Sequence, residues 1–310
     1  MNELPHIVTL TANLLAERTL EFDAWAPGQT QRARREIFQV GGKGINVAKM
    51  LNRLGAPNTA LCFPGGASGA ECEVWLRARS FALRSFPTDA PTRTGTVVRS
   101  RGERETTFLG VDVPPSAAAL RACAEFLGEQ PTGTVLAVCG SLPGWETADY
   151  DPLREALHRW PERGPLVADT HGPALAWFAN EGAALLRVNR AELESLFTAR
   201  ERTLSSGELL RTARDRWSAL RWAVSDGAAP VWFIGDSRDA ETILPPQIAE
   251  ISATGSGDVM LACALFARFH RGLSWRDAVA WALPFAAANA AHPGIAEFPF
   301  PSEGPDSLRR

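Results

Sequence analysis

The stretch ATGSGD at residues 253–258 runs directly into the apolar segment VMLACALFARF at 259–269. Two glycines and a serine therefore stand at the start of a predicted helix, and Asp258 falls in its first turn. The N–H groups of a first helical turn have no partner within the helix, and the helix dipole adds partial positive charge there. Glycine lets a ligand approach such backbone closely. The stretch thus predicts an anion cradle with a carboxylate beside it.

This combination suits phosphoryl transfer. The N–H groups of Gly255, Ser256 and Gly257 would hold the migrating phosphoryl group. The carboxylate of Asp258 would accept the proton of the attacking hydroxyl. An aspartate that simply caps a glycine-rich turn fits the same letters, so this stretch alone leaves both interpretations open.

A second glycine loop, GGKG at 41–44, opens a predicted helix over residues 44–54. Its order differs from a Walker A motif, and the spacing of a dinucleotide-binding fingerprint fails. The glycines bring backbone against a polar ligand, and Asn46 offers a donor and an acceptor to hydroxyls. Lys43 and Lys49 are the only lysines among 32 basic residues. A lysine in this loop therefore indicates a position that a guanidinium would not fit, with chance placement as the alternative.

Together, GGKGINVAKMLNRLG (41–55) and ATGSGD (253–258) resemble the two signatures of the ribokinase-like (pfkB) carbohydrate kinases. The resemblance is narrower to the phosphosugar branch, which includes 1-phosphofructokinase and tagatose-6-phosphate kinase. Shorter motifs follow the family order between the signatures: TR at 92–93, GSLP at 140–143, ADTHG at 168–172, VNRAE at 188–192 and VSDG at 224–227. The resemblance implies ATP-dependent transfer of a phosphoryl group to a phosphorylated ketohexose such as fructose 1-phosphate, with Mg²⁺ as cofactor.

Short apolar segments alternate with helical ones, which favours an α/β fold with a mostly parallel sheet covered on both faces. The predicted strands are 7–10, 59–63, 134–139, 165–169, 185–188 and 222–225. The predicted helices are 44–54, 69–79, 116–128, 149–160, 190–197, 206–216, 256–270 and 274–290. Segments 19–40 and 93–109 alternate polar and apolar residues and are predicted as β ribbons.

The resemblance implies one ribokinase-like catalytic domain over residues 1–310 and makes the two ribbons a small β lid over the sugar. An exposed ribbon edge needs cover, so we expect a homodimer through the lid. We expect the tail from 298 to 310 to be extended, because it is polar and rich in proline.

The resemblance also implies roles on the nucleotide side. Asn189 and Glu192 match the N-x-x-E motif and would position magnesium and its waters, while Asp169 would act on the metal through water. The implied nucleotide contacts are Asn189, Ser225, Gly227 and Asn289. The spacing of Asn189 and Glu192 fits a helix capping box as well. Asn289 is equally compatible with a packed polar residue.

On the acceptor side, the resemblance implies a cluster for the phosphate that the sugar already carries. Its members are Arg32, Lys43, Arg93 and Ser141. Cationic and hydroxyl donors in one cluster are what a phosphate dianion needs, although an arginine such as Arg32 is usually just solvated. The sugar hydroxyls would be held by Glu17, Gly41, Gly42 and Asn46.

Several positions depart from the family pattern. Glu17 stands where an aspartate is usual, Gly95 replaces an asparagine, and FLGV at 108–111 replaces an E-P-G segment. These three lie on the acceptor side, so we expect an active kinase with altered sugar specificity. Ala253 replaces a threonine and Arg187 a lysine near the nucleotide, which would tune affinity.

Composition narrows the function classes. The 310 residues are 45% hydrophobic and 22% charged, as in a soluble globular enzyme, and a net charge of −3 without a basic block argues against nucleic acid as partner. No apolar run reaches the roughly 18 residues of a membrane span. The five cysteines form no C-x-x-C pair, which indicates reduced core residues in a cytoplasmic protein.

Three rival functions stay open at this point. One is a kinase for an unphosphorylated sugar or a nucleoside, against which the cationic cluster argues. Another is a non-catalytic sugar-phosphate sensor, against which Asp258 and the N-x-x-E motif argue. The third is a nucleotide-dependent oxidoreductase, which lacks an intact G-x-G-x-x-G after a strand.

Overall fold

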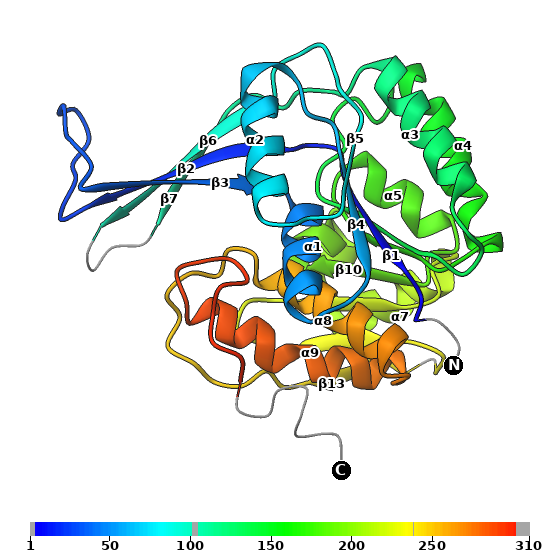
Figure 1. The fold of residues 1–310 in the computed structure, drawn as a ribbon. Helices are drawn as coiled ribbons and strands as arrows, with labels where there is room; N and C mark the ends of the chain where they lie inside the picture. The colour runs from blue at the N-terminus through cyan, green and yellow to red at the C-terminus, as the bar shows by residue number, and fades with distance from the viewer. Residues whose placement is uncertain (1–3, 101–104, 238, 302–310) are drawn as a thin grey trace.

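In the computed structural model, which describes residues 4–100, 105–237 and 239–301, nine strands form the main sheet in the order β13-β12-β11-β10-β9-β8-β1-β4-β5 (Figure 1). Pairing from β5 through β11 is parallel, and β12 and β13 add an antiparallel edge. The predicted α/β fold with a mostly parallel sheet is confirmed. The strands are β1 (Ile7–Thr11), β4 (Asn58–Cys62), β5 (Leu83–Ser85), β8 (Val135–Cys139), β9 (Leu166–Asp169), β10 (Leu185–Asn189), β11 (Trp222–Ser225), β12 (Val231–Ile234) and β13 (Glu241–Ile243).

The two faces of this sheet bury different side chains, because successive residues of a strand point to opposite sides. Val8 of β1 packs with one set of helices, whereas Ile7 packs with another. The first set is α3 (Ala117–Glu129), α4 (Asp151–His158), α5 (Pro173–Asn180), α6 (Arg190–Glu194) and α7 (Ser206–Arg216). The second set is α1 (Lys43–Arg53), α8 (Ser256–His270) and α9 (Trp275–Ala290). With both faces covered, a ligand reaches the sheet at the strand ends.

A second sheet, in the order β3-β2-β6-β7, projects from this body (Figure 1). Its strands are β2 (Leu15–Phe22), β3 (Arg35–Gly41), β6 (Arg93–Ser100) and β7 (Thr106–Leu109). It begins at Leu15, earlier than the predicted residue 19, because the chain enters β2 only three residues after β1 ends. Helix α2 (Gly66–Ala78) holds its base, since Trp75 Nε1 donates to the carbonyl of Phe38 at 3.1 Å. We call this second sheet the lid sheet.

Some element boundaries differ from the sequence prediction. The expected helix 149–160 is divided into a 3₁₀ turn, α4 and a second 3₁₀ turn, with Pro152 and Pro161 near the two junctions. Helix α5 and strands β5, β12 and β13 were not predicted. Residues 101–104 of the predicted lid ribbon and 302–310 of the predicted tail lie outside the described residues. Phe298, at the start of that tail, is buried in the core.

Among the helices in the described part of the chain, none is both long enough and apolar enough to cross a bilayer.

The packing of α1 on the sheet yields a stability prediction. Leu51 of α1 is 0% exposed, so Leu51→Ala should lower the free energy of unfolding by about 2–5 kcal/mol, the usual result of emptying a packed core position. Urea denaturation followed by circular dichroism measures this. The matched control Val74→Ala, at a residue of α2 that is 67% exposed, should change stability by about 0.5 kcal/mol or less. Equal losses in the two variants would contradict this packing.

Candidate active site

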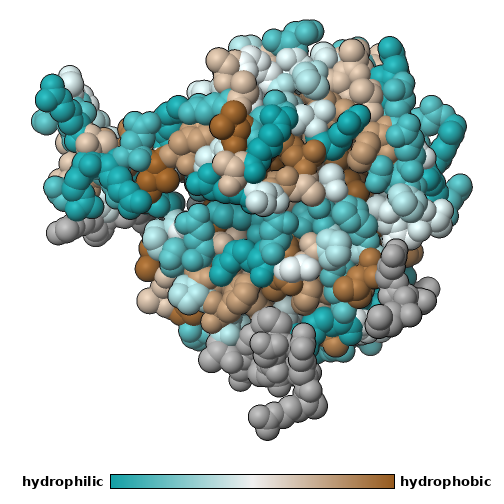
Figure 2. Space-filling model, in the orientation of Figure 1, coloured by the Kyte–Doolittle hydropathy of each residue, from teal (hydrophilic) through white to brown (hydrophobic). Residues whose placement is uncertain are grey.

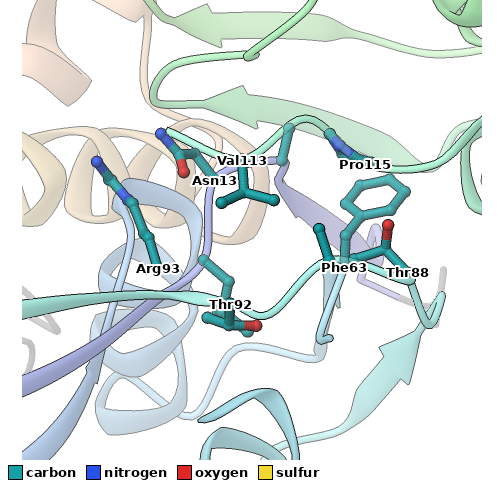
Figure 3. A pocket seen from close by; sticks show the side chains of 10 residues that line it. Asn13, Phe63, Thr88, Thr92, Arg93, Val113 and Pro115 are labelled. Carbon is teal, nitrogen blue, oxygen red and sulfur yellow. The ribbon is translucent and has the colours of Figure 1, made fainter. Parts of the chain in front are cut away.

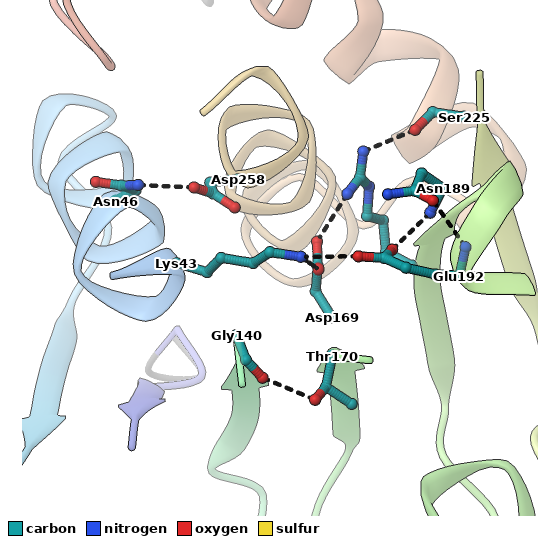
Figure 4. A network of polar contacts seen from close by, with 10 residues as sticks. Lys43, Asn46, Gly140, Asp169, Thr170, Asn189, Glu192, Ser225 and Asp258 are labelled. Carbon is teal, nitrogen blue, oxygen red and sulfur yellow. Dashed lines mark hydrogen bonds and ion pairs between the residues drawn. The ribbon is translucent and has the colours of Figure 1, made fainter. Parts of the chain in front are cut away.

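Polar residues from four parallel strands meet at the carboxyl-terminal edge of the main sheet. Asp169 ends β9 opposite Cys139 of β8, and Asn189 ends β10 opposite Ser225 of β11. Parallel strands bring their last residues to one edge, where ligands of such sheets bind. Helices α1 and α8 begin at the same edge, where Asn46 of α1 donates a hydrogen bond to Asp258 of α8 (Figure 4).

Helix α8 begins in a backbone that requires glycine. Gly255 is its N-cap residue, with φ of 75°, and a Cβ there would lie 2.4 Å from Ile295. A Cβ on Gly257 would lie 2.4 Å from the guanidinium of Arg187, which therefore rests against the first turn of α8. No side chain caps this helix within the described residues. The N–H of Ser256 donates to the carbonyl of Ala253 at 3.2 Å, so the N–H groups of Gly255 and Gly257 are the ones left for a ligand, as an anion cradle needs.

Asn289 of α9 holds the loop before α8 in place. Its Nδ2 donates to the carbonyl of Thr254 at 3.0 Å and to Ser256 Oγ at 3.1 Å, and its Oδ1 accepts from the N–H of Ala296 at 2.8 Å. The residue is only 1% exposed. The structure therefore places Asn289 behind the anion loop, where its hydrogen bonds go to protein, rather than facing an adenine as the sequence suggested.

Asp258 lies in the first turn of α8, and its carboxyl has a raised pKa. The side chain is buried, and Asn46 Nδ2 donates to its Oδ2 at 2.7 Å. Burial, with the nearby charge of Asp169, raises the pKa of Asp258 from 3.8 to about 7, although the Lys43 charge and the Asn46 hydrogen bond oppose the shift. A general base works best when its pKa lies near the working pH. The position and the pKa of Asp258 both suit a base.

The buried carboxylate of Asp169 carries a cation on each oxygen. Lys43 Nζ lies 2.6 Å from Oδ1, and Arg187 NH1 lies 3.1 Å from Oδ2 (Figure 4). Burial opposes ionisation, yet these two cations lower the pKa of Asp169. Arg187 also donates to Ser225 Oγ at 2.7 Å. Lys43, Asp169 and Arg187 thus form a continuous row of ion pairs along the sheet edge, from α1 to β11.

These ion pairs alter the expected role of Lys43. The sequence placed it with the phosphate of the acceptor, but its Nζ lies between Asp169 and Glu192 Oε1, at 2.6 Å and 3.4 Å. Despite burial, the charges of Asp169 and Glu192 raise the pKa of Lys43. The ammonium group is thus positioned beside the phosphoryl-transfer residues. Asp169, expected to act on magnesium through water, offers no carboxylate oxygen without a cation beside it.

Asn189 and Glu192 form the capping box of α6. Asn189 Oδ1 accepts from the N–H of Glu192, and Glu192 Oε2 accepts from the N–H of Asn189, each at 2.8 Å. This capping interpretation is confirmed, and it leaves Glu192 Oε1 outside the box. Within the described residues, no group of three or more histidine, cysteine, aspartate or glutamate side chains is placed to hold a metal. Glu192 Oε1 accepts a long hydrogen bond from Lys43 Nζ, at 3.4 Å. Magnesium commonly takes most of its ligands from water and substrate phosphates, so this one oxygen fits a magnesium site next to Lys43.

A pocket of about 360 Å³ lies beside the start of α8. Its polar wall comes from the ends of β10 and β11 and includes Arg187, Asn189, Ser225 and Gly227. Its apolar wall comes mainly from α8, α9 and the segment 245–248: Met260, Leu283, Ala286, Ala287, Ala290, Pro245, Pro246 and Ile248. One polar and one apolar wall suit a phosphate-bearing ligand with a flat apolar ring.

A separate polar cluster lies beyond the end of β1, where the lid sheet joins the body. Asn13 Nδ2 donates to Ser141 Oγ at 2.7 Å and to Asp112 Oδ1 at 2.8 Å. Arg93 NH1 donates to the same Asp112 oxygen at 2.8 Å. Figure 3 shows the side chains of Asn13 and Arg93 pointing the same way, beside a cavity of only about 10 Å³. We call Asn13, Arg93, Asp112 and Ser141 the acceptor cluster.

The other predicted sugar-binding residues lie near the lid sheet and the start of α1. Gly41 ends β3, and Gly42 precedes α1 with φ of 118°, where a Cβ would lie 2.6 Å from Thr11. Glu17 lies within β2 and is only 7% exposed, beside Gln39 Nε2. Burial raises the pKa of Glu17.

Arg32 lies apart from these residues. It is exposed in the loop 23–34 at the outer end of the lid sheet, where the surface is mostly hydrophilic (Figures 1 and 2). The structure does not bring Arg32 to the acceptor cluster of its own chain.

Sequence reasoning missed Asn13 and Asp112. Asn13 was passed over in favour of Glu17, because the expected sugar-binding acid lay farther along the same segment. Asp112 follows the FLGV segment that departs from the family pattern, and a carboxylate next to a departure was the available signal. Gly95 has a packing reason, since a Cβ there would lie 3.0 Å from Leu15 and 3.2 Å from Leu109.

Comparisons with known proteins identify the family and the fold. The model of the pfkB family carbohydrate kinases matches residues 7–302. A 1-phosphofructokinase of Haloferax volcanii is 31% identical, with 88% of this chain and 87% of that protein covered. The ATP-dependent 6-phosphofructokinase isozyme 2 of Mycobacterium tuberculosis is 29% identical, with 94% and 86% covered. Phosphofructokinase-2 from Escherichia coli in complex with fructose-6-phosphate shares the fold, with a TM-score of 0.82 at 23% identity, covering 93% of this chain and 94% of that one.

The environment of Asp258 predicts a directly measurable titration. In protein carrying ¹³C-labelled aspartate, one carboxyl resonance should titrate with a midpoint near pH 7 and should disappear in Asp258→Asn. Asn46→Ala removes a hydrogen bond to the ionised form, so it should move that midpoint to higher pH. Titration of every aspartate below about pH 5, close to the ordinary value, would contradict the described burial.

Proposed function

Since the chain belongs to the pfkB family of carbohydrate kinases, we propose that it transfers the γ-phosphoryl group of ATP to a hydroxyl of a phosphorylated ketohexose, such as fructose 1-phosphate. The observation that carries this proposal is the carboxyl of Asp258, with its pKa raised to about 7, at the uncapped start of α8. The names of the relatives, 1-phosphofructokinase and ATP-dependent 6-phosphofructokinase, support a phosphosugar as acceptor.

In this proposal, ATP lies in the pocket beside α8. Its phosphates face Arg187, Asn189 and Ser225, with Gly227 allowing close approach, and its base lies against the apolar wall of α8 and α9. Glu192 Oε1 and Asn189 would hold Mg²⁺ or its waters, since Asn189 lines the pocket and Glu192 is its partner in the capping box of α6. Bound there, Mg²⁺ would neutralise phosphate charge. Asp169 contributes indirectly, because its ion pairs hold Lys43 and Arg187 in position beside the phosphates.

The residues divide the reaction between them. Asp258 takes the proton from the acceptor hydroxyl as that oxygen attacks phosphorus. The N–H groups of Gly255 and Gly257 stabilise the transferring phosphoryl group, and that of Ser256 joins them only by leaving the carbonyl of Ala253. Lys43 and Arg187 supply positive charge beside the phosphoryl group. Asn46 orients the Asp258 carboxylate through its 2.7 Å hydrogen bond. The lid sheet excludes water, which would otherwise take the phosphoryl group.

The acceptor sugar would lie between the acceptor cluster and α8. Arg93 and Ser141 would hold its phosphate, while Gly41, Gly42 and Asn46 would hold hydroxyls. Glu17, in β2, would also hold a sugar hydroxyl. Arg32 would reach a sugar phosphate only from the lid of a second chain, because in its own chain it is exposed at the outer end of the lid sheet.

We also propose a homodimer through the lid sheet. Its edge strand β7 exposes Phe108 and Leu109, which are 54% and 56% exposed, and Val111 beyond it is 86% exposed. An unpaired edge with exposed apolar residues needs cover, and a second lid supplies it. The five cysteines are free and buried, which supports a reducing compartment such as the cytoplasm.

A second candidate is a kinase for an unphosphorylated sugar. One observation favours it: the carboxylate of Asp112 already lies on Arg93 and would repel an entering phosphate.

A substrate panel tests the function. ATP-dependent ADP release with Mg²⁺ would be measured against fructose 1-phosphate, fructose 6-phosphate, tagatose 6-phosphate, the free sugars and nucleosides. We expect turnover with a phosphosugar, and in Asp258→Asn a loss in kcat of about 100-fold or more with little change in ATP binding, because the base is gone. Near-normal turnover in Asp258→Asn would remove Asp258 from this role.

Turnover only with an uncharged acceptor would contradict the phosphosugar proposal and establish the second candidate. Binding of a sugar phosphate without any turnover would instead indicate the non-catalytic sensor.

A further inference from the structure

The guanidinium of Arg93 is built to hold an anion. Its side chain is only 13% exposed, and its Nε is buried without a hydrogen-bond partner among the described residues. Burial lowers the pKa of Arg93, which shows that the surroundings penalise its charge, whereas Asp112 favours it. A cation in such a place is stabilised by an anion that accepts its donors.

That anion is at present part of the same chain. One oxygen of Asp112 accepts from both Arg93 NH1 and Asn13 Nδ2, each at 2.8 Å, and Asn13 also contacts Ser141. These donors are an arginine, an amide and a nearby hydroxyl, which is the set that would bind one face of a phosphate group. The neighbouring cavity of about 10 Å³ has room for about one water molecule. A phosphate therefore enters only where Asp112 leaves.

Asp112 is free to leave. Its side chain is 53% exposed, so it can move into solvent without crossing packed atoms. Before Asp112, the last backbone hydrogen bond runs from the N–H of Gly110 to the carbonyl of Thr94. After Asp112, the next hydrogen bond of the backbone is from the N–H of Ser116 to Thr88 Oγ1. Within the described chain, no backbone hydrogen bond fixes residues 111–115.

We propose that Asp112 is a built-in competitor for the acceptor phosphate: its carboxylate occupies the Arg93 subsite and is displaced when a phosphorylated acceptor binds. This inference rests on the proposed function. It makes Asp112 a specificity-determining residue that weakens the binding of phosphosugars without taking part in phosphoryl transfer. Inorganic phosphate and phosphate monoesters that make few other contacts would occupy the subsite less, because each must displace a carboxylate already paired with Arg93.

Binding measurements on the full chain test the competitor directly. With inorganic phosphate and fructose 1-phosphate as probes in calorimetry, Asp112→Asn should tighten binding by about threefold to tenfold, since it removes the charge but keeps the size of the side chain. The matched control is Asp236→Asn, which also removes an exposed carboxylate from an arginine, Arg221, with an N–O distance of 2.6 Å. The control should leave binding unchanged.

A double-mutant cycle shows whether the gain passes through Arg93. In Arg93→Gln the binding of both probes should weaken, and adding Asp112→Asn to it should give no gain. Weaker binding in Asp112→Asn alone would overturn the proposal, because Asp112 would then contact the sugar. Binding equal to that of the Asp236→Asn control would overturn it too.

Kinetics separate this inference from the proposed function. If the wild-type chain turns over a phosphosugar, Asp112→Asn should lower its KM in the same proportion, with kcat and the KM for ATP unchanged. If no phosphosugar is turned over but Asp112→Asn still tightens phosphate binding through Arg93, the proposed function fails and the competitor stands. If turnover is present and KM does not fall, the competitor fails and the function stands.

Discussion

The arrangement of the site depends on one buried carboxylate, Asp169, held between Lys43 at 2.6 Å and Arg187 at 3.1 Å. A buried charge persists only when it is paired, and loss of one partner of a buried pair typically costs about 3–5 kcal/mol. Asp169 therefore fixes a cation from α1 and another from β10 at the edge of the sheet. Its own negative charge also helps to raise the pKa of Asp258, which the ion pairs alone would lower. One residue thus sets the position of the positive charges and adds to the effect of burial in raising the pKa of the proposed base.

The fold makes this constraint possible by bringing distant segments to one edge. Asp169 and Asn189 end neighbouring parallel strands, while Lys43 and Asp258 stand in the first turns of α1 and α8. Strand β1, which pairs with β8 and β4 inside the main sheet, leads through Asn13 into β2 of the lid sheet. The acceptor cluster lies at this junction, so a lid movement and the release of Asp112 from Arg93 would occur at the same place.

Most of the fold and half of the site chemistry follow from local sequence patterns. Most of the parallel strands were predictable because they are short apolar segments in alternation with helices, although β5 was missed. The α8 cradle was predictable because its glycines and Asp258 are adjacent in the chain. What escaped prediction depends on distant partners. Lys43 pairs with Asp169 across 126 positions, and Asn13 meets Asp112 across 99. The sequence left Asn289 open between an adenine contact and a packed polar residue, and its hydrogen bonds to Thr254, Ser256 and Ala296 depend on the tertiary packing of α9. Contacts of this kind cannot be predicted from the pattern of any single segment.

The most direct test of this electrostatic account is the pH dependence of kcat/KM in Asp169→Asn, measured with the phosphosugar that the wild-type chain uses. The wild-type profile should rise through a pH near 7 as Asp258 loses its proton. Removing the charge of Asp169, and leaving Lys43 and Arg187 unneutralised, should lower the pKa of Asp258 and move the rising limb to lower pH, however far the maximal rate falls. Where turnover is too slow, the ¹³C carboxyl titration of Asp258 reads the same shift. A limb that stays in place or moves to higher pH would contradict the central role assigned to Asp169.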